Sequence, residues 1–187
     1  FVISSQAVST WVANQIFSVD GLKGTANILA IAPYFDCDSI GNSTNSAIYS
    51  GKTVADILNR CQNTLSSLDA VLYPYQQLAT TLGLNFACYE AGTSISEQQT
   101  IINGIENPTL TALFIAANRD PQMRVIYGGI LSKMRSFGLL KSAPTMLFSS
   151  VGNPSKYGSW GLLDYEDQVT EQPTHPKFQA VLDYNNG

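Results

Sequence analysis

Glu90 is a carboxylate that directly follows a short apolar run, LNFACY, and directly precedes the glycine-containing turn AGTS. Polar and aromatic side chains also gather at the ends of the other apolar runs, namely Gln6, Tyr34, Asp36, Asp38, Tyr89, Ser149 and Ser150. Carboxylate, phenol and hydroxyl groups can hydrogen-bond the hydroxyl groups of a ligand, and a carboxylate can also exchange a proton with it. These residues are therefore the candidates for a functional site.

The other reactive side chains predict neither a metal centre nor a nucleophilic triad. Cys37, Cys61 and Cys88 are odd in number, widely separated and without C-x-x-C spacing, so we expect small buried hydrophobic residues rather than disulfides or zinc ligands. His175, the only histidine, lies in the proline-flanked segment PTHPK, which indicates a surface position and argues against a Ser-His-Asp machine. The paired acids of DCDSIGNST lack the closing glutamate of a calcium loop. We expect no metal and no cofactor.

The elements that would position these residues alternate along the chain between short apolar runs and longer helical stretches. The runs predict strands near residues 1–6, 27–34, 84–90 and 144–150. Helices are expected over AVSTWVANQIF, from Thr53 to an interruption at Pro74, from Asp120 and Pro121 to Gly138, and over the tail HPKFQAVLDYNNG. Such alternation is typical of parallel βαβ units, so we expect all four strands to run parallel.

Composition limits the classes of partner. The chain has 187 residues, of which 44% are hydrophobic and 13% charged, which is enough for one globular core. Its net charge of −4 disfavours nucleic acid and anionic membrane surfaces as partners. No apolar run approaches the roughly 18 residues that span a bilayer, so we expect no membrane insertion. The start, FVISSQ, lacks the marks of a signal peptide, and the residues indicate no cellular location.

The positions of the polar residues favour a barrel over an open sheet. A (β/α)8 barrel keeps its active site at the C-terminal ends of its strands, and neither G-x-G-x-x-G nor a Walker sequence follows any predicted strand. A typical barrel needs eight strands and about 250 residues. We therefore expect residues 1–187 to be a single partial domain, strands five to eight with the final C-terminal helix, whose partner is the missing N-terminal half. Alone it should expose apolar surface and self-associate.

Several segments carry a resemblance to a known group of proteins: ILAIAPYF, CYEAG, NRDPQMRVIY and SKYGSWGLLDYEDQ, followed by HPKFQAVLDY. In this order, over nearly the whole chain, they resemble the C-terminal half of a largely uncharacterised group of bacterial (β/α)8 glycoside-hydrolase-like proteins, often labelled cellulose-binding. In that group the acidic motif has glycine where Ala91 stands and glutamine where Thr93 stands. The loop after Glu90 therefore departs from the pattern, while the carboxylate is kept.

The resemblance implies roles for the candidate residues. Retaining glycosidases use two carboxyl groups about 5–5.5 Å apart, and if NFACYE is strand seven, Glu90 is the nucleophile candidate, with its acid/base partner upstream of this chain. Tyr34 and Asp36 could contact sugar hydroxyls. Tyr89 could hydrogen-bond the nucleophile or pack in the barrel wall. Trp160, beside two glycines, could stack on a pyranose ring or be an ordinary core residue.

Three functions remain open from the sequence, so enzyme activity is uncertain. The chain is a fragment of a retaining glycoside hydrolase, a non-catalytic carbohydrate-binding protein on the same scaffold, or a structural domain in which Glu90 forms a salt bridge. A carbohydrate is the expected partner in the first two cases. An extracellular or cell-surface location follows only if the resemblance holds.

Overall fold

The computed structural model describes residues 1–22, 24–37, 49, 51–96, 107–141, 143–171, 173 and 175–186. The chain forms two compact units. The first unit consists of residues Phe1–Tyr34, Ser66–Ala91 and Ser132–Leu147, and the second consists of Phe35–Leu65, Gly92–Leu131 and Phe148–Gly187. Each unit is therefore assembled from segments that are distant in sequence, and each is described below by itself.

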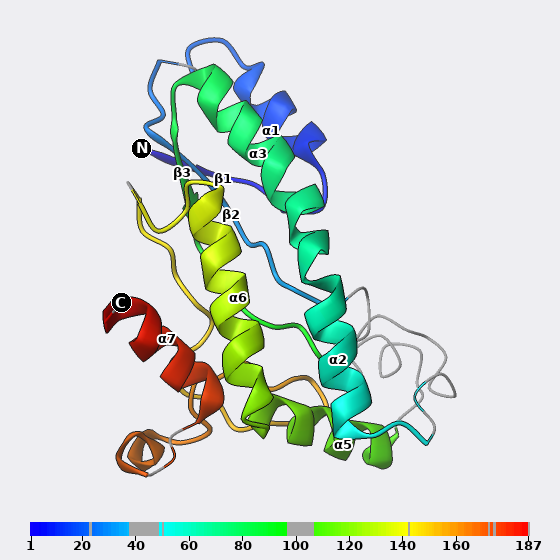
Figure 1. The fold of residues 1–187 in the computed structure, drawn as a ribbon. Coiled ribbons are helices and arrows are strands. Elements are labelled where there is room, and N and C mark those ends of the chain that lie inside the picture. Colours follow the sequence, from blue (N-terminus) through cyan, green and yellow to red (C-terminus); the bar gives the residue numbers. More distant parts are fainter. Residues whose placement is uncertain are drawn as a thin grey trace. The chain divides into compact units, whose positions relative to one another are not determined.

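The first unit contains the sheet, a set of three parallel strands in the order β1 (Val2–Ser4), β2 (Ile28–Ile31) and β3 (Asn85–Cys88). In register, Ser4 lies beside Ala30, which lies beside Ala87. Helices α1 (Thr10–Phe17) and α3 (Leu68–Leu82) lie next to these strands (Figure 1). The mixed α/β class and the parallel direction of the first three predicted strands are confirmed.

The two faces of this sheet differ in how they are covered. One face carries Leu29, Ile31 and Phe86, all buried, and α3 packs on β3. The opposite face carries Val2 and Ile28; Val2 is 58% exposed. That face borders an apolar hollow of about 90 Å³, which is lined by Val2, Ile28, Ala30, Ala87, Cys88, Tyr89, Pro144 and Met146. Part of the apolar surface of the sheet is thus open.

The predicted fourth strand at 144–150 is reduced to a single bridge, in which Thr145 pairs in parallel with Cys88. Pro144 cannot donate to a ladder because it lacks a backbone N–H. Ser149, in the second unit, pairs with another partner: its N–H donates to the carbonyl of Trp160, and its own carbonyl accepts from Leu162. The run therefore begins beside β3 and leaves the sheet after a few residues.

The predicted helix from Thr53 is divided at a point that the sequence did not indicate. It forms α2 (Val54–Thr64), the 3-10 turn η3 (Leu65–Ser67) and α3. The expected interruption at Pro74 is wrong, because this proline lies inside α3. Both Pro74 and Ala70, whose carbonyl loses its helical donor, are exposed, so water can solvate that carbonyl. Gly83, with φ +68°, ends α3 in the left-handed conformation.

The second unit is mainly helical. It contains α2 and α5 (Pro108–Arg119), which pack on each other, the 3-10 turn η4 (Glu166–Thr170) and α7 (Pro176–Asn186). Helix α6 (Gln122–Ser136) begins in this unit, as predicted from Asp120, whose Oδ1 accepts a hydrogen bond from the N–H of Gln122 at 2.9 Å. Helix α5 was not predicted, although Asn107 caps it and Pro108 occupies its first turn.

A disulfide joins Cys37 to Cys61 within the second unit and corrects the expectation of three unpaired cysteines. It ties the segment after Phe35 to the buried side of α2 across 24 residues of sequence. Cys88 is the free cysteine and is buried, as predicted. None of the helices in the described ranges is both long and apolar enough to cross a membrane.

Candidate functional site

Glu90 and Tyr34 meet at the edge of the sheet where β2 and β3 end. Tyr34 follows the last residue of β2 by three positions, and Glu90 follows the last residue of β3 by two. Neighbouring parallel strands end at the same edge, so these side chains can reach each other. The hydroxyl of Tyr34 donates a hydrogen bond to Glu90 Oε2 at 2.7 Å. The sequence placed both residues at strand ends, but it did not predict this hydrogen bond.

The charge environment of Glu90 is that of a carboxylate without a counter-ion. Its side chain is half-buried, and no lysine or arginine in the described part of the chain forms an ion pair with it. A salt-bridge role predicts a cation within about 4 Å of the carboxylate. The hydrogen-bonding partner of Glu90 is instead the neutral phenol of Tyr34.

The thiol of Cys88 contacts the backbone carbonyl of Glu90. Cys88 Sγ lies 2.7 Å from the carbonyl oxygen of Glu90 and 3.7 Å from that of Met146. Burial raises the pKa of this thiol to about 12, so the sulfur keeps its proton and can act as a donor. Cys88 is therefore a support for the backbone at Glu90 rather than a nucleophile.

Tyr89 and Gln6 take part in contacts other than those expected. Tyr89 is 38% exposed, and its hydroxyl lies 3.4 Å from the carbonyl oxygen of Ser5, which follows β1. Tyr75 of α3 donates to the carbonyls of Gln6 and Ser9. Burial raises the pKa of Tyr75, which keeps its hydroxyl protonated as a donor. These phenols brace the segment after β1, and neither bonds Glu90.

The turn after Glu90 continues into a paired segment of the second unit. The N–H of Phe35 donates to the carbonyl of Gly92 at 2.9 Å, and the N–H of Ser94 donates to the carbonyl of Phe35 at 2.8 Å. The hydroxyl of Thr93, the residue that departs from the resemblance, lies 3.3 Å from Asn118 Oδ1, and both side chains are buried. Thr93 thus has a packing role in this unit.

The remaining predicted site residues, Asp36 and Trp160, belong to the second unit. Asp36 is half-buried and directly follows Phe35, whereas Asp38 lies outside the described residues. Trp160 is also half-buried; its indole Nε1 donates to the carbonyl of Tyr157 at 3.0 Å, and its ring meets that of Phe148 edge to face at 6.3 Å. Tyr157 and Phe148 are 55% and 44% exposed. Trp160 is therefore part of a partly exposed aromatic cluster.

A second group of functional side chains, not predicted from the sequence, surrounds Asp164 in the second unit. Asp164 is 5% exposed, and its Oδ2 accepts from Arg119 Nε at 2.8 Å. Its Oδ1 lies 3.6 Å from His175 Nε2. Lys177 is 1% exposed, and its ammonium donates to the carbonyl of Ser159. The prediction of a surface histidine is wrong, because His175 is 4% exposed.

Burial controls the protonation of this group. Burial and, to a smaller extent, the positive charge of Lys177 together lower the pKa of His175 to about 4, while Asp164 opposes the shift. Burial also lowers the pKa of Lys177 to about 7, again against the attraction of Asp164. His175 is therefore neutral near pH 7, with one ring nitrogen as a donor and the other as an acceptor.

Two sequence signals could have revealed this group. Asp164 is an acid that follows two leucines, and both leucines and the acid are buried. Pro176 is the first residue of α7, so His175 directly precedes a helix, and its carbonyl accepts from the N–H of Gln179. Within the described ranges, no group of three or more His, Cys, Asp or Glu side chains could hold a metal. No known protein family, curated protein or solved structure matches this chain.

Proposed function

We propose that this chain is part of a retaining glycoside hydrolase, in which Glu90 is the nucleophile and the remaining half of a (β/α)8 barrel supplies the acid/base carboxyl group. The observation that carries the proposal is the 2.7 Å hydrogen bond from Tyr34 to Glu90 at the C-terminal ends of adjacent parallel strands. Barrel enzymes keep their catalytic groups at this edge.

The arrangement around Glu90 suits a nucleophile. Tyr34 holds Oε2, which fixes the carboxylate, while Oε1 forms no hydrogen bond to a described residue. The absence of a cation among its described neighbours leaves the negative charge of the carboxylate uncompensated. In the proposed reaction Oε1 attacks the anomeric carbon, and the glycosidic bond breaks as the second carboxyl group protonates the leaving oxygen. Water then hydrolyses the glycosyl-enzyme ester.

The sheet supports the barrel part of the proposal. Its strands are parallel, one face is packed under α3, and the apolar face around Val2 and Ile28 is partly open. In a closed barrel the inner faces of the strands pack against each other to form the core. The missing half would therefore cover this face.

The test uses the full-length parent protein with Glu90→Gln, measured on a panel of aryl glycosides and polysaccharides. This change keeps the shape of the side chain and removes the nucleophile, so turnover should fall by at least about a thousandfold while sugar binding persists. Glu166→Gln is the matched control, because Glu166 is an exposed carboxylate of η4; its turnover should equal that of the wild type. Unchanged turnover in Glu90→Gln would remove Glu90 from the mechanism.

A second candidate function, carbohydrate binding without turnover, is favoured by the partly exposed ring pair of Phe148 and Trp160. Aromatic rings that are partly exposed can stack on the apolar face of a sugar. Gly158 lies against the indole of Trp160, so a side chain there would displace the ring. This function requires no second carboxyl group.

The two tryptophans of the chain provide a matched test of this candidate. Trp160→Ala should abolish binding to an immobilised cellulose-type polysaccharide, whereas Trp11→Ala, at a 64% exposed position on α1, should leave binding unchanged. Binding by the wild type with no hydrolysis of any glycan would favour this candidate over the hydrolase. If Trp160→Ala and Trp11→Ala lost polysaccharide binding to the same extent, a specific sugar-stacking role for Trp160 would be contradicted.

A further inference from the structure

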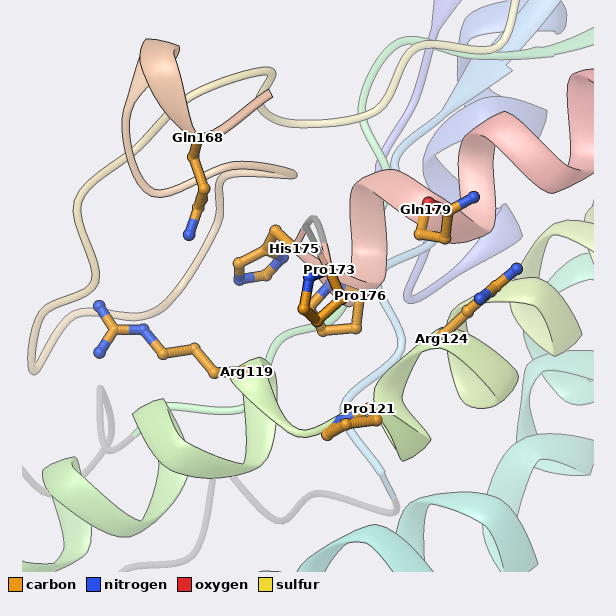
Figure 2. A pocket seen from close by; sticks show the side chains of 8 residues that line it. All are labelled: Arg119, Pro121, Arg124, Gln168, Pro173, His175, Pro176 and Gln179. Carbon is orange, nitrogen blue, oxygen red and sulfur yellow. The ribbon is translucent and has the colours of Figure 1, made fainter. Parts of the chain in front are cut away.

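A cavity of about 330 Å³ lies in the second unit, beside the group around Asp164. It is lined by Arg119, Pro121, Arg124, Gln168, Pro173, His175, Pro176 and Gln179. Figure 2 shows Arg119, Gln168 and His175 on one side of Pro173 and Pro176, and Arg124 with Gln179 on the other. The cavity thus has two polar ends separated by prolines, and its volume is at the lower end of the range of small-molecule sites.

Arg119 presents an unused hydrogen-bonding edge to this cavity. Its Nε donates to Asp164 at 2.8 Å, which fixes the plane of the guanidinium. Neither Nη atom bonds a described residue, and the side chain is 52% exposed. Two parallel N–H groups on one edge of a guanidinium match the two oxygens of a carboxylate.

His175 provides the second, independent indication of a ligand. Its side chain is 98% buried in the cavity wall, and neither ring nitrogen has a hydrogen-bond partner among the described residues. A buried polar group without a partner is costly, so such groups in folded proteins require an explanation. Because the ring is neutral near pH 7, it can donate to one oxygen and accept from a hydroxyl.

Arg124, at the other end of the cavity, has no such capacity. Its Nε and Nη2 donate to both oxygens of Asp183, at 2.6 and 2.8 Å. Gln179 Nε2 donates to the same carboxylate at 3.1 Å. Arg124 thus uses both Nε and Nη2 on Asp183, whereas Arg119 bonds Asp164 through Nε alone, so Arg119 is the one whose two Nη groups can take an anion.

The geometry points to a binding site for a small hydroxylated organic acid, whose carboxylate accepts from the Nη groups of Arg119 and whose hydroxyl bonds the ring of His175. Gln168 lies on the same side of the cavity (Figure 2). Its Oε1 accepts a hydrogen bond from the N–H of Asp164 at 2.7 Å, and its NH₂ group takes no part in that bond. Sugar acids such as D-glucuronate are one class of ligand that combines a carboxylate with hydroxyl groups.

This inference does not rest on the proposed role of Glu90. Every residue of the cavity belongs to the second unit, whereas Glu90 and Tyr34 belong to the first. Failure of the cavity to bind an acid would therefore leave the hydrolase proposal standing, and the reverse is also true.

The experiment uses the fact that His175 is the only histidine. The full chain, labelled with ¹⁵N-histidine, is titrated with D-glucuronate while the imidazole signals are followed by NMR. D-glucose, which lacks the carboxylate, and inorganic phosphate, a different oxyanion, are titrated in parallel. We expect a saturable shift with glucuronate and no shift with glucose. No shift with glucuronate, an equal response to glucose, or tighter binding of phosphate would each overturn the inference.

Arg119→Lys and Arg124→Lys form a matched pair, because both variants keep the charge and lose the guanidinium. Loss of the bidentate contact should weaken glucuronate binding about tenfold in Arg119→Lys. Binding in Arg124→Lys should stay within about twofold of the wild type, since that guanidinium bonds Asp183. Equal weakening in both variants would show that binding does not depend specifically on the guanidinium of Arg119 and would overturn its role. If Arg119→Lys does not fold, the three wild-type titrations still decide the question.

Discussion

The two units differ in the groups that surround one carboxylate in each, Glu90 in the first unit and Asp164 in the second. In the first unit Glu90 is half-buried and bonded by the neutral hydroxyl of Tyr34. In the second unit Asp164 is buried and lies near the cationic Arg119 and Lys177. A carboxylate with a neutral partner keeps its charge available to a ligand, whereas one surrounded by cations uses its charge to hold the fold.

The difference explains how one chain can contain two sites of opposite character. The uncompensated carboxylate of the first unit suits a reaction at an electrophilic carbon. In the second unit Arg119, which bonds Asp164 through Nε alone, also lines the cavity, so the cavity suits an anion. The same functional group, a carboxylate, is thus proposed to take part in chemistry in one unit and contributes to structure in the other.

The largest expected effect comes from making the same change at both carboxylates. Asp164→Asn should lower the free energy of unfolding by about 4 kcal/mol, because it leaves Lys177 buried without its compensating charge. Glu90→Gln should lower it by less than about 1 kcal/mol, since an amide oxygen can still accept from Tyr34. Urea unfolding of the two variants measures both values, and equal losses would break the comparison.

The disulfide gives the next effect, which is confined to the second unit. Cys37→Ser combined with Cys61→Ser should lower the free energy of unfolding by about 3.5 kcal/mol, because a loop closed over 24 residues is released in the unfolded chain. The measurement is urea unfolding with and without a reductant. The reductant should destabilise the wild type and leave the double variant unchanged; insensitivity of the wild type would contradict the pairing.

Acid should destabilise the protein partly through the second unit. The pKa of His175 is about 4 in the folded chain, below its ordinary value of 6.5, so the unfolded chain binds more protons between these pH values. The contribution of His175 to stability is complete above pH 6.5 and is lost as the pH falls toward 4, in total about 3 kcal/mol. Asp164, Lys177 and Arg119 are the charged groups that act on this histidine.

The check on this prediction is His175→Asn, unfolded by urea at a series of pH values from 4 to 7. The stability of the wild type relative to this variant should be greatest at pH 7 and should decrease as the pH falls. A constant difference between the two proteins would show that His175 binds a proton equally well in the folded and unfolded states.

The smallest expected effect belongs to the first unit. Tyr34→Phe removes the hydrogen bond to Glu90 and should lower the free energy of unfolding by about 1 kcal/mol. Tyr73→Phe is the matched control, because Tyr73 is 57% exposed on α3 and forms no described hydrogen bond. A loss in Tyr34→Phe as large as that of Asp164→Asn would mean that the Glu90 pair holds the fold as strongly as the buried group does.

The first three strands could be predicted because they depend on local patterns, since each apolar run is short and uninterrupted. The rule that polar residues follow parallel strands placed Tyr34 and Glu90 at one edge of the sheet, but their hydrogen bond was not predicted. The run at 144–150 is also apolar, but it pairs with β3 only around Thr145, and Ser149 pairs instead with Trp160. Apolar composition alone does not distinguish a strand from a segment that turns away.

The second site was not predicted because its side chains do not follow the predicted strands, so no strand-end rule brings them together. Arg119 and Asp164 are 45 positions apart, and the two bonded cysteines are separated by 24. The prolines that flank His175 predict a turn, but they do not indicate whether its ring faces water or the interior. Only packing decides that question, and here α7 begins at Pro176 with its first residues buried.

The buried thiol of Cys88 has a consequence for the oxidation of the chain. Thiol–disulfide exchange proceeds through the thiolate, and a pKa of about 12 leaves a negligible fraction of Cys88 in that form at neutral pH. Once the chain is folded, Cys88 therefore cannot displace either sulfur of the Cys37–Cys61 bond. An odd number of cysteines would otherwise allow three alternative pairings, and the sheet that buries Cys88 preserves the one that forms.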